Sequence, residues 1–109
     1  MIGNKSGYEV HGFNDLDAVG VTNAAQTTGM NFALQVTVAD IGTNVVIRLE
    51  ASVDGLNYFN LDENDSDITI TSNGTYGYAL SGCPVQYVRI RLVSFDGGSP
   101  TVSSKMGAT

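Results

Sequence analysis

Apolar and polar residues alternate along three stretches of this chain. In residues 31–40, NFALQVTVAD, Phe, Leu, Val and Val occupy one set of alternate positions, and Ala, Gln, Thr and Ala occupy the other. Residues 45–53 and 86–94 alternate in the same way. A period of two places successive side chains on opposite faces of a β-strand, so each stretch predicts a strand with one buried and one wetter face. No stretch shows the 3.6-residue period of an amphipathic helix.

Turn-forming residues separate these strands from several shorter ones. Asp54-Gly55 and Asn73-Gly74 are typical of type I′ hairpin turns, and glycines at 82 and 97–98 flank the last long strand. The sequence therefore predicts strands at 8–10, 19–26, 31–40, 45–53, 57–61, 68–72, 75–80, 86–94 and 101–106. Many short strands with closely spaced turns predict an all-β fold, an antiparallel β-sandwich of jelly-roll type with about eight strands.

The first 20 residues are more polar and less periodic than the rest of the chain. We expect residues 1–20 to form an extended N-terminal arm that packs against the domain or against a neighbouring subunit. Residues 21–109 are expected to form the sandwich itself. A length of 109 residues suits one domain with one modest core.

Charge and cysteine content narrow the range of partners. Eleven acidic residues oppose five basic ones, giving a formal net charge of −6. Nucleic acid and anionic membranes attract basic surfaces, so neither is expected as a partner. The single cysteine, Cys83, allows no internal disulfide. The chain has no apolar leader and no long apolar run, so we expect synthesis in a cytoplasm.

The acidic segment 61–67, LDENDSD, invites comparison with a calcium loop. Counted from Asp62, the sixth residue is Asp67 where an EF-hand needs glycine, and the twelfth is Asn73 where it needs glutamate. The favoured interpretation is therefore a solvated loop without metal. A looser calcium site built from Asp62, Asp65 and Asp67 is the weaker alternative.

The sequence lacks the residues from which catalytic sites are commonly built. His11 is the only histidine, no G-x-S-x-G motif accompanies it, and no glycine-rich phosphate loop is present. We therefore expect no enzymatic activity and no cofactor.

Two groups of side chains are candidates for binding. Arg48, Arg89 and Arg91 project from the wetter faces of strands, where they either pair with Glu50 and nearby acids or contact an acidic partner or adjacent subunit. The aromatic group either packs in and across the sheets or forms a sugar-stacking platform. Its members are Tyr58, Phe59, Tyr76, Tyr78 and Tyr87.

Two motifs carry a family resemblance that spans about residues 21–109. The first, S-x-D-G-x-N-aromatic, is filled by Ser52, Asp54, Gly55, Asn57 and Tyr58; the second, G-x-P-V-x-Y-V-R, runs from Gly82 to Arg89 and precedes Gly97-Gly98. This pattern resembles small β-sandwich virion proteins of tailed bacteriophages, the capsid decoration or cement proteins. It is more weakly similar to discoidin-like galactose-binding sandwiches, from which it departs because Tyr58 stands where tryptophan is usual.

The resemblance implies a structural protein of the virion, made in the bacterial host and placed on the capsid surface. Its implied partners are the major capsid protein and further copies of itself, commonly in a homotrimer. The alternatives are a carbohydrate- or receptor-binding sandwich using Tyr58, Tyr76, Tyr78 and the 62–67 loop, and a tail, neck or baseplate component. The candidate interface residues are Tyr8, His11, Phe13, Arg48, Arg89 and Arg91.

Overall fold

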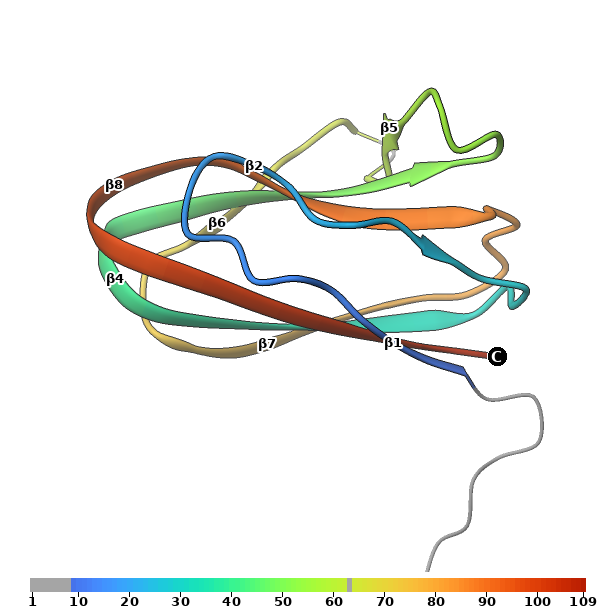
Figure 1. Ribbon diagram of the computed structural model, residues 1–109, viewed down its shortest axis with the longest axis horizontal. Helices are drawn as coiled ribbons and strands as arrows, with labels where there is room; N and C mark the ends of the chain where they lie inside the picture. Colours follow the sequence, from blue (N-terminus) through green and yellow to red (C-terminus); the bar gives the residue numbers. More distant parts are fainter. Residues whose placement is uncertain (1–8, 63) are drawn as a thin grey trace, which may run out of the picture.

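The structure, a computed structural model, describes residues 9–62 and 64–109 (Figure 1). These residues form eight strands and no helix, so the prediction of an all-β antiparallel fold is confirmed. No helix that could cross a membrane occurs among them. The strands are β1 (Glu9–Gly12), β2 (Gly20–Val21), β3 (Ala25–Gln26), β4 (Phe32–Ser52), β5 (Phe59–Asn60), β6 (Ile68–Ile70), β7 (Gly74–Leu80) and β8 (Tyr87–Ala108).

Two long strands, β4 and β8, build most of the molecule. They pair antiparallel over their whole lengths, from Phe32 opposite Ala108 to Ser52 opposite Tyr87, with register shifts around residues 39–47. The prediction of separate strands at 31–40 and 45–53, and at 86–94 and 101–106, is therefore wrong. Each pair of predicted strands is one strand that bends, because the glycines between them make a corner and not a chain reversal.

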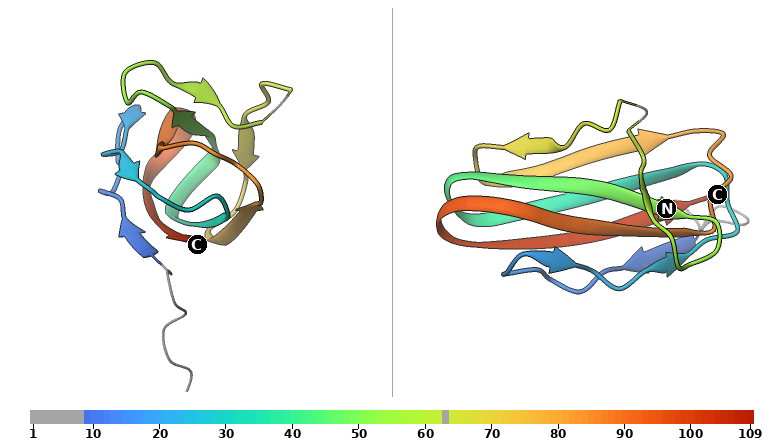
Figure 2. Two further views of the ribbon diagram at one scale, coloured as in Figure 1. Left: turned by 90° about the vertical axis from the view of Figure 1, so that its right-hand side faces the viewer. Right: turned by 90° about the horizontal axis from the view of Figure 1, so that it is seen from above.

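The bend folds the sheet into two layers (Figures 1 and 2). The first layer contains β7, residues 32–39 of β4, residues 101–108 of β8, and β1. The second layer contains residues 44–52 of β4 and residues 87–96 of β8, with β5 and β6 along β4 and with β2 and β3 along β8. The apolar alternate positions of both layers face one another, as in a sandwich.

Glycines allow the two backbones to touch at the corner. An ideal Cβ on Gly42 would lie 2.3 Å from the carbonyl carbon of Gly97, and one on Gly98 would lie 2.5 Å from the Gly42 nitrogen. Gly97 and Gly98 also have φ values of 70° and 69°, in the left-handed region that favours glycine. The corner therefore depends on small residues in both strands.

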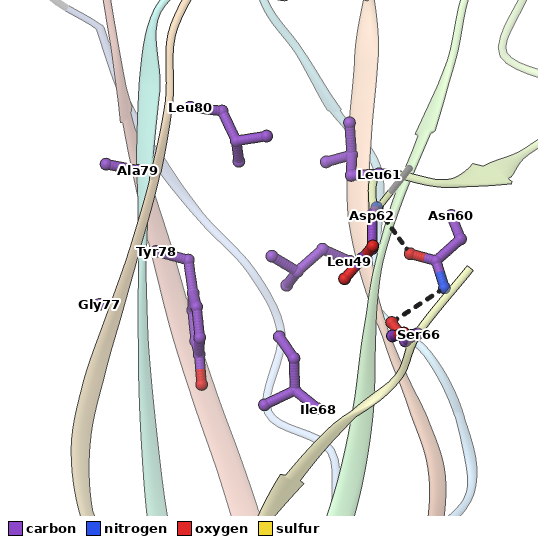
Figure 3. Close-up of a pocket in the computed structure, with 10 residues that line it drawn as sticks. All are labelled: Leu49, Asn60, Leu61, Asp62, Ser66, Ile68, Gly77, Tyr78, Ala79 and Leu80. Atoms are coloured by element: carbon purple, nitrogen blue, oxygen red, sulfur yellow. Dashed lines mark hydrogen bonds between the residues drawn. The ribbon is translucent and has the colours of Figure 1, made fainter. Parts of the chain in front are cut away.

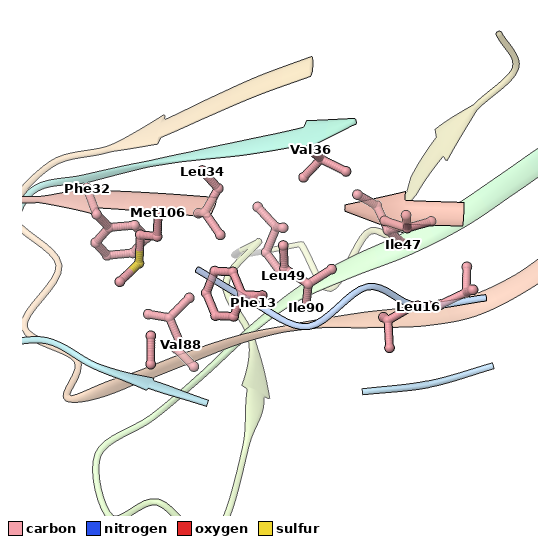
Figure 4. Close-up of a cluster of buried hydrophobic side chains, with 14 of the residues drawn as sticks. Phe13, Leu16, Phe32, Leu34, Val36, Ile47, Leu49, Val88, Ile90 and Met106 are labelled. Atoms are coloured by element: carbon pink, nitrogen blue, oxygen red, sulfur yellow. The ribbon is translucent and has the colours of Figure 1, made fainter. Parts of the chain in front are cut away.

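The core lies between the layers (Figure 4). It contains the inward-facing residues predicted from the alternation, Phe32, Leu34, Val36 and Val38 among them. Two further members, Phe13 and Leu16, come from the N-terminal segment.

Residues 9–21 pack on this domain, which is one of the two arrangements expected for the arm. β1 and β2 pair with β8, and the amides of Leu16 and Val102 each donate to the other's carbonyl, at 2.9 and 2.8 Å. Phe13 is only 7% exposed, so its ring belongs to the core and does not lie where a partner would contact it. Tyr8 and the rest of residues 1–8 lie outside the described residues.

The turn at Asp54-Gly55 also differs from the type I′ prediction. Type I′ needs positive φ at both central residues; Gly55 has φ 79°, whereas Asp54 is not among the residues with positive φ. The Asp54 carboxylate accepts hydrogen bonds from the amides of Leu56 and Asn57, at 2.8 and 2.9 Å. Because of these bonds, the chain forms a loop that is wider than a two-residue hairpin turn.

We predict that Gly42→Ala destabilises the protein by at least about 2 kcal/mol, because a methyl group would separate the two backbones at the corner. Gly12→Ala is the matched control, since a Cβ there meets no atom within 4 Å. Urea unfolding of both variants measures the difference. Equal stabilities would contradict the role of the corner.

Candidate functional site

A charged cluster occupies the outer face of the second layer. Glu50 lies opposite Arg89, and Arg48 lies opposite Arg91, in the β4–β8 ladder. The Nε atoms of Arg89 and Arg91 each donate to a Glu50 carboxylate oxygen at 2.8 Å, and Arg48 Nη1 lies 3.8 Å from that carboxylate. The Glu50 side chain is only 6% exposed. Of the two interpretations of the three arginines, the structure shows pairing with Glu50 and nearby acids.

Two loops are attached to this cluster. Arg48 donates to both carboxylate oxygens of Asp67, at 2.7 and 3.1 Å. The Arg89 guanidinium lies 3.6 Å from the centre of the Tyr58 ring, a cation–π contact. The end of the acidic segment and the loop after β4 are therefore held against the same face of the sheet.

The arginines also change the acidity of their partners. Burial by itself raises the pKa of Glu50, but the hydrogen bonds from Arg91 and Arg89 outweigh it, and the pKa lies below its usual value. The hydrogen bonds from Arg48 likewise lower the pKa of Asp67. Both carboxylates are therefore ionised at neutral pH.

The loop at 52–59 forms a fixed apolar tip. Amide hydrogen bonds from Asn57 and Leu56 hold the pKa of Asp54 far below its usual range, and Ser52 Oγ also donates to this carboxylate at 2.9 Å. The bonded loop presents three apolar side chains, which we call the apolar tip: Val53, Leu56 and Phe59 are 66%, 84% and 46% exposed. Such exposed groups on an ordered loop are available to a partner.

A pocket of about 460 Å³ opens between β7 and residues 60–68 (Figure 3). Tyr78 and Leu80 of β7 face it from the first layer. Its other walls come from the second layer and the acidic segment: Leu49, Asn60, Leu61, Asp62, Ser66 and Ile68. The volume lies in the range of small-molecule sites.

The pocket is apolar, with a polar rim. The Asn60 side chain is already engaged, because its oxygen accepts from the Asp62 amide at 2.9 Å and its nitrogen donates to the Ser66 carbonyl at 3.3 Å. Burial raises the pKa of Tyr78, and the nearby Tyr76 raises it further by a smaller amount, so the Tyr78 phenol is neutral. The walls therefore suit an apolar side chain or the apolar face of a ring.

The structure places the aromatic residues of the sugar-binding alternative at different sites, so they do not form one platform. Tyr78 and Asp62 line the pocket, whereas Tyr58 stacks on Arg89 and the Tyr76 hydroxyl donates to the Ser72 carbonyl at 2.6 Å. The pocket itself was not predicted, because its size depends on the separation of the two layers.

The calcium alternative finds no ligand cluster in the described part of the chain. No three His, Cys, Asp or Glu side chains gather there as metal ligands. Asp67 bonds to Arg48, and Asp62 accepts from the Asn64 amide at 2.8 Å. The arrangement is that of a loop held by local hydrogen bonds.

His11 lies at the edge of the first layer. Its Nε2 is 2.9 Å from Glu9 Oε1, and Glu9 Oε2 accepts from the Thr28 hydroxyl at 2.6 Å. These bonds join β1 to the segment after β3, across the open side of the sandwich. This link was not predicted, because no local pattern in the sequence connects Glu9 with Thr28.

Comparison with solved structures shows the fold. The chain is similar to the SPBc2 prophage-derived protein YomS, with TM-score 0.60 and 13% identity over 93% of each chain. It is also similar to a protein from a study of Bacillus endospore appendages, described as disulfide-linked pili, with TM-score 0.52 and 11% identity over 94% of this chain and 88% of that one. A family 29 carbohydrate-binding module from Piromyces equi gives TM-score 0.48 and 11% identity, covering 96% and 83%. No protein-family model and no curated protein matches the sequence.

We predict that Glu50→Gln lowers the free energy of unfolding at pH 7 by about 1–3 kcal/mol, because it leaves partly exposed arginines without their carboxylate. The folded pKa of Glu50 lies below its ordinary 4.5, so the carboxylate's contribution is complete above pH 4.5 and is lost as pH falls through the folded pKa. The difference between wild type and variant should therefore shrink below pH 4.5.

Urea unfolding measured from pH 7 to pH 3 tests this, with Asp15→Asn as the control because Asp15 is an exposed acid outside the cluster. A stability difference that does not change with pH would show that Glu50 contributes through packing and not through its charge.

Proposed function

We propose that this chain is a non-catalytic structural protein of a phage particle, a decoration protein that binds the outside of the head and stabilises the shell. The feature that carries the proposal is the apolar tip, which Asp54 holds in one conformation. A preorganised apolar anchor loses little conformational freedom on binding. The fold shared with a prophage-derived protein supports the assignment to phage.

The ionisable groups favour binding over chemistry. A general acid or base works best with a pKa near the working pH. Glu50, Asp54 and Asp67 have pKa values lowered by hydrogen bonds, which makes them weak bases and leaves them without a proton to donate. Each instead fixes part of the surface.

The proposed partner is the major capsid protein, contacted by many copies of this chain as homotrimers on the virion surface. Each copy adds a modest contact, and copies joined in one assembly bind together more tightly than single copies. Internal pairing of Arg48, Arg89 and Arg91 keeps that face ordered, which leaves the apolar tip as the main contact.

We predict that purified protein binds undecorated heads in a fixed ratio and raises the temperature at which they rupture. Leu56→Asp should weaken binding at least tenfold, because it places a charge at the centre of the apolar tip. Val19→Asp, which alters a valine 62% exposed on another segment, is the control. Co-sedimentation measures both.

Failure of the wild type to bind heads, or equal binding by Leu56→Asp, would overturn this proposal. Binding to tails or baseplates alone would assign the chain to those parts of the particle instead.

The pocket favours a second candidate, a carbohydrate- or receptor-binding sandwich on the virion surface. Tyr78 offers a ring for stacking against a sugar, and Asp62 and Ser66 lie at the rim. A glycan screen with and without calcium tests it. Binding that Tyr78→Ala removes and Phe59→Ala preserves would support the pocket; no binding in either condition would exclude this candidate.

A further inference from the structure

The outer face of the first layer is a sheet face with mostly small side chains. Inward positions of this layer fill the core, so the alternate positions point outward. The register aligns Gly107, Ala33 and Ala79 in one row across β8, β4 and β7, and Lys105, Gln35 and Gly77 in the next. Hollows of about 380 and 130 Å³ lie over this face, because its small side chains leave space above the backbone.

The charges on this face differ from those of the whole chain. Eleven acidic residues oppose five basic ones in the sequence, yet Lys105 is the only charged side chain that points outward from the paired rows of the first layer. One acid stands beside it. Leu16 pairs with Val102, which places the preceding residue, Asp15, next to Ser103.

Lys105 and Asp15 are both available to a partner. Both are exposed, and both line the smaller hollow. Neither takes part in an ion pair with another residue of the described ranges. The face therefore offers one positive and one negative group on an otherwise uncharged surface.

We propose that this face packs against the same face of a second copy of the chain, about a two-fold axis. The axis lies in the interface and crosses the strands between the row of Lys105 and the row of Ser103. These rows are two residues, or about 7 Å, apart, and the rotation exchanges them. Because Asp15 lies in the row of Ser103, each Lys105 then lies over Asp15 of the other copy. A surface that binds itself needs this reciprocal complementarity.

The dimensions of the face indicate a weak contact. Four strands make it about 19 Å wide, and the seven residues of β7 make it about 24 Å long. Each copy would therefore cover roughly 450 Å², or about 900 Å² in total, which lies above most crystal contacts and below a standard interface. The side chains of Gln35 and Lys105 would enter the hollows of the other copy, as in the packing of two sheets. We expect a reversible association.

The chemistry of the face favours a second copy over other partners. A sugar-binding platform presents aromatic rings, and no aromatic side chain points outward from the paired rows of this layer. An apolar partner would need a larger apolar patch, whereas Val10, 66% exposed, is the only large apolar side chain in these rows. One lysine is too little charge for an acidic polymer.

The inference goes beyond the proposed function. A two-fold contact cannot build a homotrimer, so this contact would be additional to it and would join two single copies or two homotrimers. It involves neither the apolar tip nor the pocket, and it is tested without heads.

The test is a charge exchange, measured by sedimentation equilibrium from about 10 μM to about 1 mM protein. Lys105→Glu places two acids opposite each other at each pair, and Asp15→Lys places two bases there. The double variant carries both changes and restores an opposite-charge pair in the reversed sense. Asp96→Lys is the matched control, because it makes the same charge change at an exposed acid of the second layer. Circular dichroism checks that every variant is folded.

We expect the wild type and Asp96→Lys to associate reversibly into a species of twice the mass. Each single variant at the pair should raise the dissociation constant at least about tenfold, because like charges then face each other. The double variant should return to the wild-type constant within about threefold. Added salt should weaken the association of the wild type and of the double variant alike.

A wild type that shows no doubling of mass, single variants that associate like the wild type, or a double variant that associates no better than the singles would each overturn the inference. If heads are still bound in any of these cases, only the two-fold contact falls. If the charge exchange behaves as expected and heads are not bound, only the head-binding function falls.

Discussion

The continuous backbone ladder between β4 and β8 holds the two layers of the sandwich together. Both strands belong to both layers, so the layers cannot separate without breaking the ladder or opening the corner. The corner in turn requires Gly42 and Gly98, where the two backbones approach too closely for side chains, and Gly97, whose φ of 70° favours glycine. The facing apolar positions then fill the space between the layers without any disulfide.

Polar contacts fix the positions of loops and side chains on the surface of the sandwich. Glu50 joins the arginines of both long strands, and through them Asp67 and Tyr58 hold two loops against the second layer. Asp54 performs the same task for the apolar tip. These carboxylates have lowered pKa values because they accept hydrogen bonds, which suits a role in shaping a binding surface.

Alternation along the sequence was enough to predict strands, the fold class and the inward residues of β4. It could not predict that β4 and β8 each run through the corner, because Gly42 and Gly97-Gly98 have the local signature of a turn. Each strand stays continuous through the corner because β4 and β8, which are distant in the sequence, pair on both sides of it. The sequence also left undecided whether the arginines pair with Glu50 or contact another molecule. The reason is related, since only the register places Arg89 opposite Glu50. Phe13 was predicted to lie in an extended arm because the residues around it do not alternate regularly between apolar and polar.

We propose that this sandwich works by binding, through the fixed adhesive features of its surface. The decisive measurement is an image reconstruction of particles that contain the protein. We expect density for the sandwich on the outer surface of the head, with the apolar tip against the shell. Density on the tail alone, or on the head with Leu56 facing solvent, would contradict it.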